Sequence, residues 1–454
     1  MAKVWWHSEL PRRPHLLGSD QEVNQMERTL AAELPAVPVG TTARVQGWLH
    51  RRRMLAQVTF VVLRDRTGLV QVVVKDPDTI AQVAGYGEET VLEVTGSVSA
   101  NASAPAGVEI VDPVLQPLGE PAETPPVELW RPSLTAGLPT LLDHAPVTLR
   151  HPRSKAAWLL AAASMAGFRS ALTGNGFTEI STPKLVGAST ESGANVFTVD
   201  YFGRPAFLAQ SPQLYKQVLV GVFERVFEVG PVFRAEPHDT VRHIAEYVSL
   251  DAEVGFIRDH RDVLTLLRTA LAGMVECIGE CASPAVELLD VRLPAVPDEI
   301  PVVHFAEALR LVGADPDEPD LAPEHERALS AWAEEEHGSE FLAVEGYPMR
   351  KRPFYTHPQP DDPRWSNSFD LLFRGLELTT GGQRLHRYAD YLAALRAGGQ
   401  DEASYAGYLE AFRHGMPPHG GFAIGLERWV ARLVGAANIR QVRLFPRDLH
   451  RLSP

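Results

Sequence analysis

The chain has 454 residues, of which 45% are hydrophobic and 22% charged, with two cysteines and a formal net charge of −14. At roughly 100–200 residues per domain, this length predicts two to four folded domains. The composition excludes disordered and collagenous proteins, two cysteines cannot form a disulfide framework, and no apolar run approaches the ~20 residues of a membrane helix.

The N-terminal end differs in charge from the rest of the chain. Residues 1–75 hold eleven Lys or Arg and six Asp or Glu, whereas residues 315–340 hold ten acidic residues and one Arg. A basic end suggests contact with a polyanion, although chance would produce the same distribution. Residues 1–35 are assigned to an N-terminal extension, and because it has no apolar signal segment we expect a cytoplasmic protein.

The next part of the chain is rich in strand-forming residues. Five short β-branched runs occupy residues 41–113, with a turn at residues 65–68. Five strands in about 75 residues suggest a small closed β-barrel with a basic, aromatic face, which is typical of an OB-fold. We therefore assign residues 36–115 to an OB-fold domain. Residues 116–150 are proline-rich and show little periodicity, which predicts a hinge or linker.

Residues 151–454 are assigned to a catalytic domain of the α+β class. Residues 155–174 are rich in Ala and Leu and predict a helix. The later strands come in hairpin-like pairs, which favours an antiparallel sheet flanked by helices. There is no GxGxxG or GxxxxGK[ST] motif, so any phosphate chemistry needs another architecture.

A first polar cluster lies in two neighbouring strands within residues 227–255. Period-2 alternation puts polar side chains on one face of each strand: Glu228, Arg234 and Glu236 on the first, and Ser249, Asp251 and Glu253 on the second. The simple alternative is a solvent-exposed face. The loop between the strands adds Arg242 and His243, and cations beside carboxylates suggest a phosphate site with a metal.

A second cluster lies in residues 366–388. A two-residue turn at Arg374 and Gly375 would place Asp370 and Glu377 on the same face of neighbouring strands. Two such carboxylates repel each other unless a cation bridges them, and oxygen ligands suit Mg²⁺. The alternative is that Glu377 pairs with an arginine such as Arg384.

A third cluster is GGFAIGLERWVARLV, residues 420–434. Its apolar residues follow helical spacing and predict a buried stripe: Leu426, Trp429, Val430, Leu433 and Val434. Arg428 lies off this stripe in the first helical turn. A cation there opposes the helix dipole, which is easier to explain if it faces an anion.

These segments resemble, in order, the motifs of class II aminoacyl-tRNA synthetases. GFTEISTPKL (176–185) resembles motif 1, FRAE (233–236) resembles the start of motif 2, and IGLERW (424–429) resembles motif 3. QSPQLYKQ, RPFYT, GGQRLHRY and LFPRD are similar to the archaeal-type aspartyl-tRNA synthetases of that family. The resemblance covers roughly residues 40–454. It implies an N-terminal OB-fold anticodon-binding domain and a class II catalytic domain, in a homodimer with Pro183 at the interface.

The resemblance also implies residue roles. Arg234 and Arg428 would be catalytic, and the ATP site would comprise Arg234, Glu236, Arg242, His243, Glu377, Gly425 and Arg428. Aspartate would be bound by Glu191, Gln213, Lys216, Thr380 and Arg384. Asp370 and Glu377 would hold Mg²⁺, and Arg51, Arg52, Phe60 and Gln71 would contact the tRNA anticodon stem and loop.

The implied activity is ATP-dependent ligation of L-aspartate to tRNA(Asp) through aspartyl-adenylate, with tRNA(Asn) as an open second acceptor. A carboxylate substrate is already a nucleophile, so the missing Ser-His-Asp arrangement is expected. We also expect asparagine to be rejected roughly 10⁴–10⁵-fold, because a neutral amide would leave Lys216 and Arg384 unpaired. The alternatives are a paralogue that activates aspartate for a non-tRNA acceptor or makes asparagine, and an inactive tRNA-binding regulator.

Overall fold

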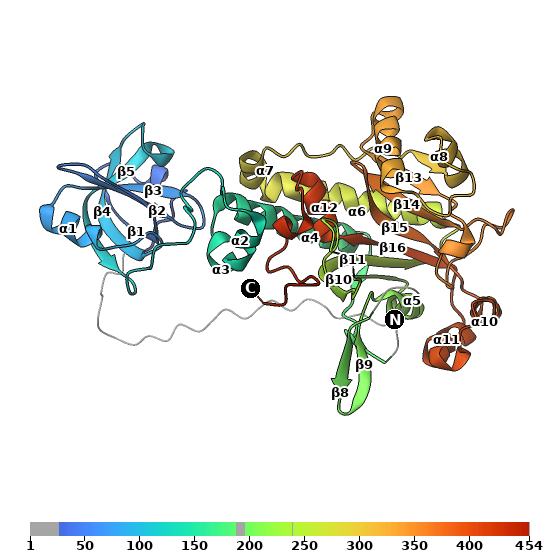
Figure 1. Cartoon of the computed structure of the whole chain (residues 1–454). Coiled ribbons are helices and arrows are strands. Elements are labelled where there is room, and N and C mark those ends of the chain that lie inside the picture. Colours follow the sequence, from blue (N-terminus) through green and yellow to red (C-terminus); the bar gives the residue numbers. More distant parts are fainter. Residues whose placement is uncertain (1–26, 188–195, 238, 454) are drawn as a thin grey trace, which may run out of the picture. The chain divides into compact units, whose positions relative to one another are not determined.

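The structure, a computed structural model, describes residues 27–187, 196–237 and 239–453 (Figure 1). The chain divides into two compact units, Met1–Pro132 and Ser133–Pro454. The division falls within the stretch expected as a linker, which also contains the short helices α2 (Leu138–Asp143) and α3 (Ala145–Thr148). In the described ranges, no helix is long and apolar enough to cross a membrane.

The first unit contains the five-stranded closed barrel that the sequence predicts, in the order β1-β2-β3-β5-β4. Its elements are β1 (Thr42–Met54), β2 (Thr59–Arg64), β3 (Leu69–Val74), α1 (Pro77–Ala84), β4 (Val91–Ala100) and β5 (Val108–Pro117). Alternate residues of β4 point into the barrel, as expected for strands with one buried face. The core is built largely of valine and leucine.

The second unit is built on an eight-stranded sheet in the order β12-β13-β14-β15-β16-β11-β10-β6. These strands are β6 (Thr178–Glu179), β10 (Arg225–Phe233), β11 (Glu246–Gly255), β12 (Val302–His304), β13 (Phe341–Glu345), β14 (Ser368–Phe373), β15 (Leu376–Arg384) and β16 (His419–Gly425). Pairing is antiparallel from β13 to β10, whereas the edge strands β12 and β6 pair in parallel with their neighbours. The sheet is therefore mixed, which corrects the expectation of a purely antiparallel sheet only at its two edges.

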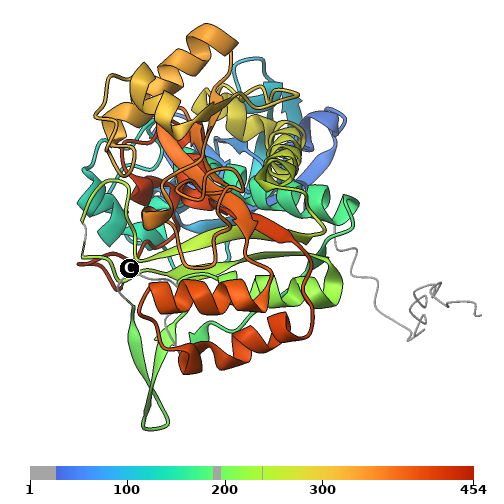
Figure 2. The same ribbon diagram turned by 90° about the vertical axis from the view of Figure 1, so that its right-hand side faces the viewer.

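The helices of this unit surround the sheet. They are α4 (Pro152–Gly174), α5 (Gln213–Phe223), α6 (His260–Cys281), α7 (Ser283–Leu289), α8 (Phe305–Leu311), α9 (Pro323–His337), α10 (Tyr388–Ala397), α11 (Ala406–Arg413) and α12 (Leu426–Leu433). A smaller sheet contains β7 (Leu185–Val186), β8 (Thr198–Tyr201) and β9 (Arg204–Leu208). Figures 1 and 2 show the β8–β9 hairpin projecting from the unit.

The main core lies between one sheet face and the helices α4, α6 and α12. The helices α4 and α6 approach closely where Gly167 meets Gly273, since a Cβ at Gly167 would lie 2.3 Å from the Gly273 carbonyl oxygen. Leu250, Ala252 and Ile424 point into this core. Because side chains alternate along a strand, their neighbours in sequence point to the opposite face of the sheet.

Candidate active site

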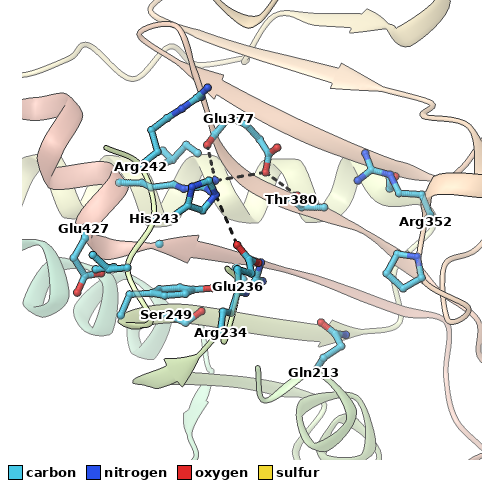
Figure 3. A pocket seen from close by; sticks show the side chains of 18 of the residues that line it. Gln213, Arg234, Glu236, Arg242, His243, Ser249, Arg352, Glu377, Thr380 and Glu427 are labelled. Carbon is cyan, nitrogen blue, oxygen red and sulfur yellow. Dashed lines mark hydrogen bonds and ion pairs between the residues drawn. The ribbon is translucent and has the colours of Figure 1, made fainter. Parts of the chain in front are cut away.

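A cavity of about 320 Å³ lies on this opposite face of the sheet (Figure 3). Its walls come from β11, β15 and β16, the loop after β10, and the N-terminal ends of α5 and α12. Ten residues that the sequence assigned to the ATP or aspartate site line it: Gln213, Arg234, Glu236, Arg242, His243, Glu377, Thr380, Arg384, Gly425 and Arg428. Segments more than 200 residues apart thus meet at one cavity.

Other expected site residues lie outside the cavity lining. Asp370 and Lys216 are buried beside it, with 4% and 1% of their surface exposed. Glu191 lies outside the described residues. Pro183 is exposed in the second unit, and its expected place in a dimer interface stays a prediction.

One part of the cavity wall is strongly cationic. Arg234, Arg242 and Arg428 line it together with His243, and each of the four lies at a long distance from a carboxylate. The separations are 3.8 Å for Arg234–Glu236, 3.7 Å for His243–Glu236, 3.5 Å for Arg242–Glu326 and 3.9 Å for Arg428–Glu377. Exposed ion pairs at such distances are weak, so an anionic ligand can compete for these cations.

A second part of the site contains a buried network of two cations and two carboxylates. Lys216 Nζ lies 3.0 Å from Asp251 and 3.3 Å from Glu253. Arg384 Nε donates to Glu253 at 3.0 Å, and its Nη2 donates to the Gly421 carbonyl oxygen at 3.0 Å. Burial alone would raise the pKa of Glu253, but the charges of Arg384 and Lys216 outweigh it and lower that pKa.

This network excludes one alternative and corrects one expectation. The polar face of β11 is not solvent-exposed, because Asp251 and Glu253 are 1% and 0% exposed. The two cations already have acidic partners, so a neutral amide would not leave them unpaired, and the expected 10⁴–10⁵-fold rejection of asparagine lacks that support.

The strand β10 also corrects the sequence interpretation. Glu228 lies on the predicted face, opposite Asp251, but it does not line the cavity: it accepts hydrogen bonds from Thr182 and from Lys184 Nζ at 2.7 Å. β10 ends at Phe233, so the period-2 pattern does not extend to Arg234 and Glu236. These two residues reach the cavity from the loop that follows.

The expected hairpin at residues 374 and 375 is confirmed. Leu372 pairs with Glu377, and a bulge after Leu371 places Asp370 opposite Thr380. Arg384 does not pair with Glu377, because it is committed to Glu253. Instead Glu377 lies 3.9 Å from Arg428, and Asp370 Oδ2 accepts from Arg352 at 2.9 Å.

The two carboxylates fit a divalent cation. Asp370 Oδ1 is buried and has no hydrogen-bond partner among the described residues. Desolvation and, next, the charge of Asp370 raise the pKa of Glu377 to about 7, with Arg428 and Arg352 opposing, so a further cation beside the pair would favour the ionised form of Glu377. No cluster of three or more His, Cys, Asp or Glu ligands occurs in the described part of the chain. Substrate phosphates and water would therefore complete the coordination of Mg²⁺, which commonly keeps several waters.

Sequence reasoning missed several cavity residues. Arg352 and Tyr355 belong to the RPFYT segment, to which no role was assigned, yet both line the cavity. Glu427 also lines it, although it is 1% exposed; it accepts from the Val248 amide and from Arg443 Nη1. Burial raises the pKa of Glu427 to about 7, with Arg443 opposing. The sequence offered one sign of this: Glu427 is an acidic residue next to the predicted buried stripe of the helix.

The barrel residues expected to contact the anticodon have definite partners. Arg52 Nη1 donates to the carbonyl oxygens of Val83, Ala84 and Tyr86, so Arg52 stabilises the C-terminal end of α1. Arg51 stacks on Trp130, with 4.1 Å from Cζ to the ring centroid.

Phe60 and Gln71 lie on neighbouring strands of the barrel. Phe60 is half-buried and lies beneath the guanidinium of Arg53 at 4.8 Å, and Gln71 donates to Glu109 at 2.8 Å. The anticodon roles of all four expected residues stay predictions.

Comparison with known proteins agrees with this architecture. The family described as tRNA synthetases class II (D, K and N) matches residues 138–449, and the OB-fold nucleic acid binding domain family matches residues 43–118. The chain therefore belongs to the class II tRNA synthetases. It is an aminoacyl-tRNA synthetase by family, with the nucleic-acid-binding barrel at its N-terminal side.

Individual proteins similar to this chain are aspartate and asparagine members of the family. Proteins named Aspartate–tRNA(Asp/Asn) ligase from Deinococcus radiodurans and Thermus thermophilus are both 46% identical, covering 94% of this chain and 99% and 100% of the relatives. The solved asparaginyl-tRNA synthetase of Pyrococcus horikoshii with asparaginyl-adenylate has a TM-score of 0.88 at 30% identity, covering 95% of this chain and 100% of that chain. The aspartyl-tRNA synthetase of Entamoeba histolytica has a TM-score of 0.83 at 27% identity, covering 98% and 99%.

Proposed function

We propose that this chain ligates L-aspartate to tRNA through an aspartyl-adenylate, and that it accepts both tRNA(Asp) and tRNA(Asn). The observation that carries the proposal is one cavity that is lined by three arginines and a histidine suited to phosphates, Arg234, Arg242, Arg428 and His243, and by the buried Arg384. The names of the relatives at 46% identity support the same activity.

The activation step suits this set of side chains. The aspartate α-carboxylate attacks the α-phosphorus of ATP in line and expels pyrophosphate, so no side chain has to act as the nucleophile. Arg234 would stabilise the charge developing on the α-phosphate, and His243 and Arg428 would hold the departing phosphates. A Mg²⁺ ion held by Asp370 and Glu377 would neutralise phosphate charge when bound. Transfer of aspartate to the 3′-hydroxyl of the terminal tRNA adenosine completes the reaction.

The non-tRNA alternatives are less well supported. The OB-fold match and the retained Phe60 on the barrel favour a tRNA acceptor, because an enzyme acting on a small acceptor has no use for an anticodon reader. The homodimer and Pro183 as an interface residue rest on family resemblance alone, and the cytoplasmic location rests on the family and on the absence of an apolar signal segment in the sequence.

Aspartate-dependent exchange of pyrophosphate into ATP tests the activation step. We expect exchange with aspartate and little with asparagine; exchange driven better by asparagine would overturn the amino-acid assignment. Charging of purified tRNA(Asp) and tRNA(Asn) side by side then tests the acceptor. Aspartylation of both supports the proposal, whereas charging of only tRNA(Asp) would remove its second part.

Phe60→Ala tests the role of the barrel in tRNA binding separately from the activation step in the catalytic unit. Stacking of one base on an aromatic ring contributes about 1–3 kcal/mol to binding. Loss of the Phe60 ring should therefore raise the KM for tRNA roughly 5- to 150-fold. Pyrophosphate exchange should stay unchanged, because the free enzyme performs it without tRNA. Val114→Ala, at another exposed barrel position, is the matched control. Equal losses in charging and exchange would argue against an anticodon role for Phe60.

A further inference from the structure

The last part of the chain packs against the loop that joins β10 to β11. The described residues of this loop are 234–237 and 239–245, and they include Arg242 and His243. The Ile439 amide donates to the Val241 carbonyl oxygen at 2.9 Å, and the Ala245 amide donates to the Arg447 carbonyl oxygen at 2.7 Å. Backbone contacts from the C-terminal segment thus fix the loop at two points.

Arg440 lies between these two points and is only 7% exposed. Its Nη2 donates to Asp239 at 2.7 Å, and its Nη1 donates to the Thr240 carbonyl oxygen at 3.1 Å. Its Nε donates to Asp448 at 2.5 Å, and the side chain of Asp448 is 9% exposed. Charge-assisted hydrogen bonds of a nearly buried arginine are strong and directional, so they fix the loop backbone in one position.

The loop residues held by Arg440 in turn contact the cationic wall of the cavity. The Thr240 hydroxyl lies 2.6 Å from His243 Nδ1 and accepts from the Arg242 amide at 3.2 Å. Arg242 and His243 both line the cavity, as does Ile439, the neighbour of Arg440. A continuous chain of contacts therefore runs from Arg440 through Thr240 to the two phosphate-site cations.

We propose that Arg440 is a positioning residue for ATP, acting through Asp239 and Thr240 to hold Arg242 and His243 where the outer phosphates bind. This inference rests on the proposed function for the identity of the nucleotide. Arg440 is paired with two aspartates, so it adds little charge of its own to the cavity. Arg440 acts by fixing the positions of Arg242 and His243. Its loss should therefore weaken the binding of ATP and leave the binding of aspartate unchanged.

The test is titration of the full-length protein and its variants with Mg-ATP, without amino acid, together with exchange kinetics. Loss of the outer-shell partners that orient metal ligands typically costs 10–100-fold, and this range is a guide to the loss of a residue that orients other ligand-binding side chains. We expect Arg440→Ala to raise the Kd and KM for ATP by roughly tenfold or more, with the KM for aspartate unchanged. Arg440→Lys, which keeps the charge but only part of the contacts, should recover part of the loss. Asp239→Asn, at a half-exposed position, should give a smaller change of the same kind without a folding defect.

Arg451→Ala is the matched control, because Arg451 belongs to the same segment and pairs with Asp143 at 2.6 Å. It should leave ATP affinity as in the parent protein. An equal rise in the KM values for ATP and aspartate, or a lower Tm with unchanged ATP affinity in the folded variants, would overturn the role of Arg440. Absence of aspartate-dependent exchange in the parent protein, with ATP binding intact, would instead overturn the proposed function.

Discussion

Replacing Arg384 with alanine should sharply reduce the use of aspartate while leaving ATP binding nearly intact. Arg384 is buried, lines the cavity and has a guanidinium matched to a side-chain carboxylate. Truncating one partner of a buried, hydrogen-bonded charge pair costs about 2–5 kcal/mol. The kcat/KM for aspartate should therefore fall roughly 30- to 5,000-fold, measured by pyrophosphate exchange at saturating ATP.

The same substitution also removes a partner of Glu253, which is fully buried. Leaving a buried carboxylate with less compensation destabilises a fold by about 3–5 kcal/mol, so the Tm of the variant must be measured. Calorimetric titration with Mg-ATP checks that the folded cavity persists. Arg413→Ala serves as the control, because Arg413 is exposed at the end of α11 and donates only to the Tyr388 hydroxyl among the described residues. Unchanged aspartate kinetics in a folded Arg384→Ala variant would refute the aspartate-site assignment.

Asp370→Asn should raise the Mg²⁺ requirement of exchange and lower its rate at fixed metal. The substitution keeps the size of the side chain and an oxygen that can face Arg352, but it removes the charge that suits a hard cation. Since disturbing residues around a metal ligand already costs 10–100-fold, loss of the ligand charge should cost at least about 100-fold in kcat/KM for Mg-ATP.

The measurement is the Mg²⁺ dependence of exchange in parent and variant proteins. Asp298→Asn is a suitable control, because the side chain of Asp298 is fully exposed and pairs only with Arg268 among the described residues. An Asp370→Asn protein with the Mg²⁺ dependence of the parent would contradict the metal assignment.

Local features of this fold were predictable from the sequence. The barrel strands follow from runs of β-branched residues, and the pairing of Leu372 with Glu377 follows from a two-residue turn. The buried stripe of α12 follows from helical spacing, with Leu426, Trp429, Val430 and Leu433 all buried. Each of these depends on residues that are close together in the chain.

Non-local pairings were not predictable in the same way. The sequence placed Lys216 and Arg384 together only through family resemblance, and it gave no sign that Asp251 and Glu253 already neutralise them. Those contacts join α5, β11 and β15, which are far apart in sequence. The period-2 pattern put Glu228 on the correct face, opposite Asp251, but it could not place Arg234 and Glu236, because β10 ends at Phe233.

The contacts of Arg440 illustrate the same limit. It meets Asp239 across about 200 residues of chain, at the point where the C-terminal segment crosses the motif 2 loop. No periodicity or short motif in the sequence predicts the contact between Arg440 and Asp239.

We infer that one cavity holds the nucleotide and the amino acid together on one face of the sheet. The most direct measurement is a crystal structure of the protein with a non-hydrolysable aspartyl-adenylate analogue. We predict that the phosphate-like group lies against Arg234 and that the aspartate side chain reaches Arg384. An analogue bound in another place, or with its side chain turned away from Arg384, would contradict the account.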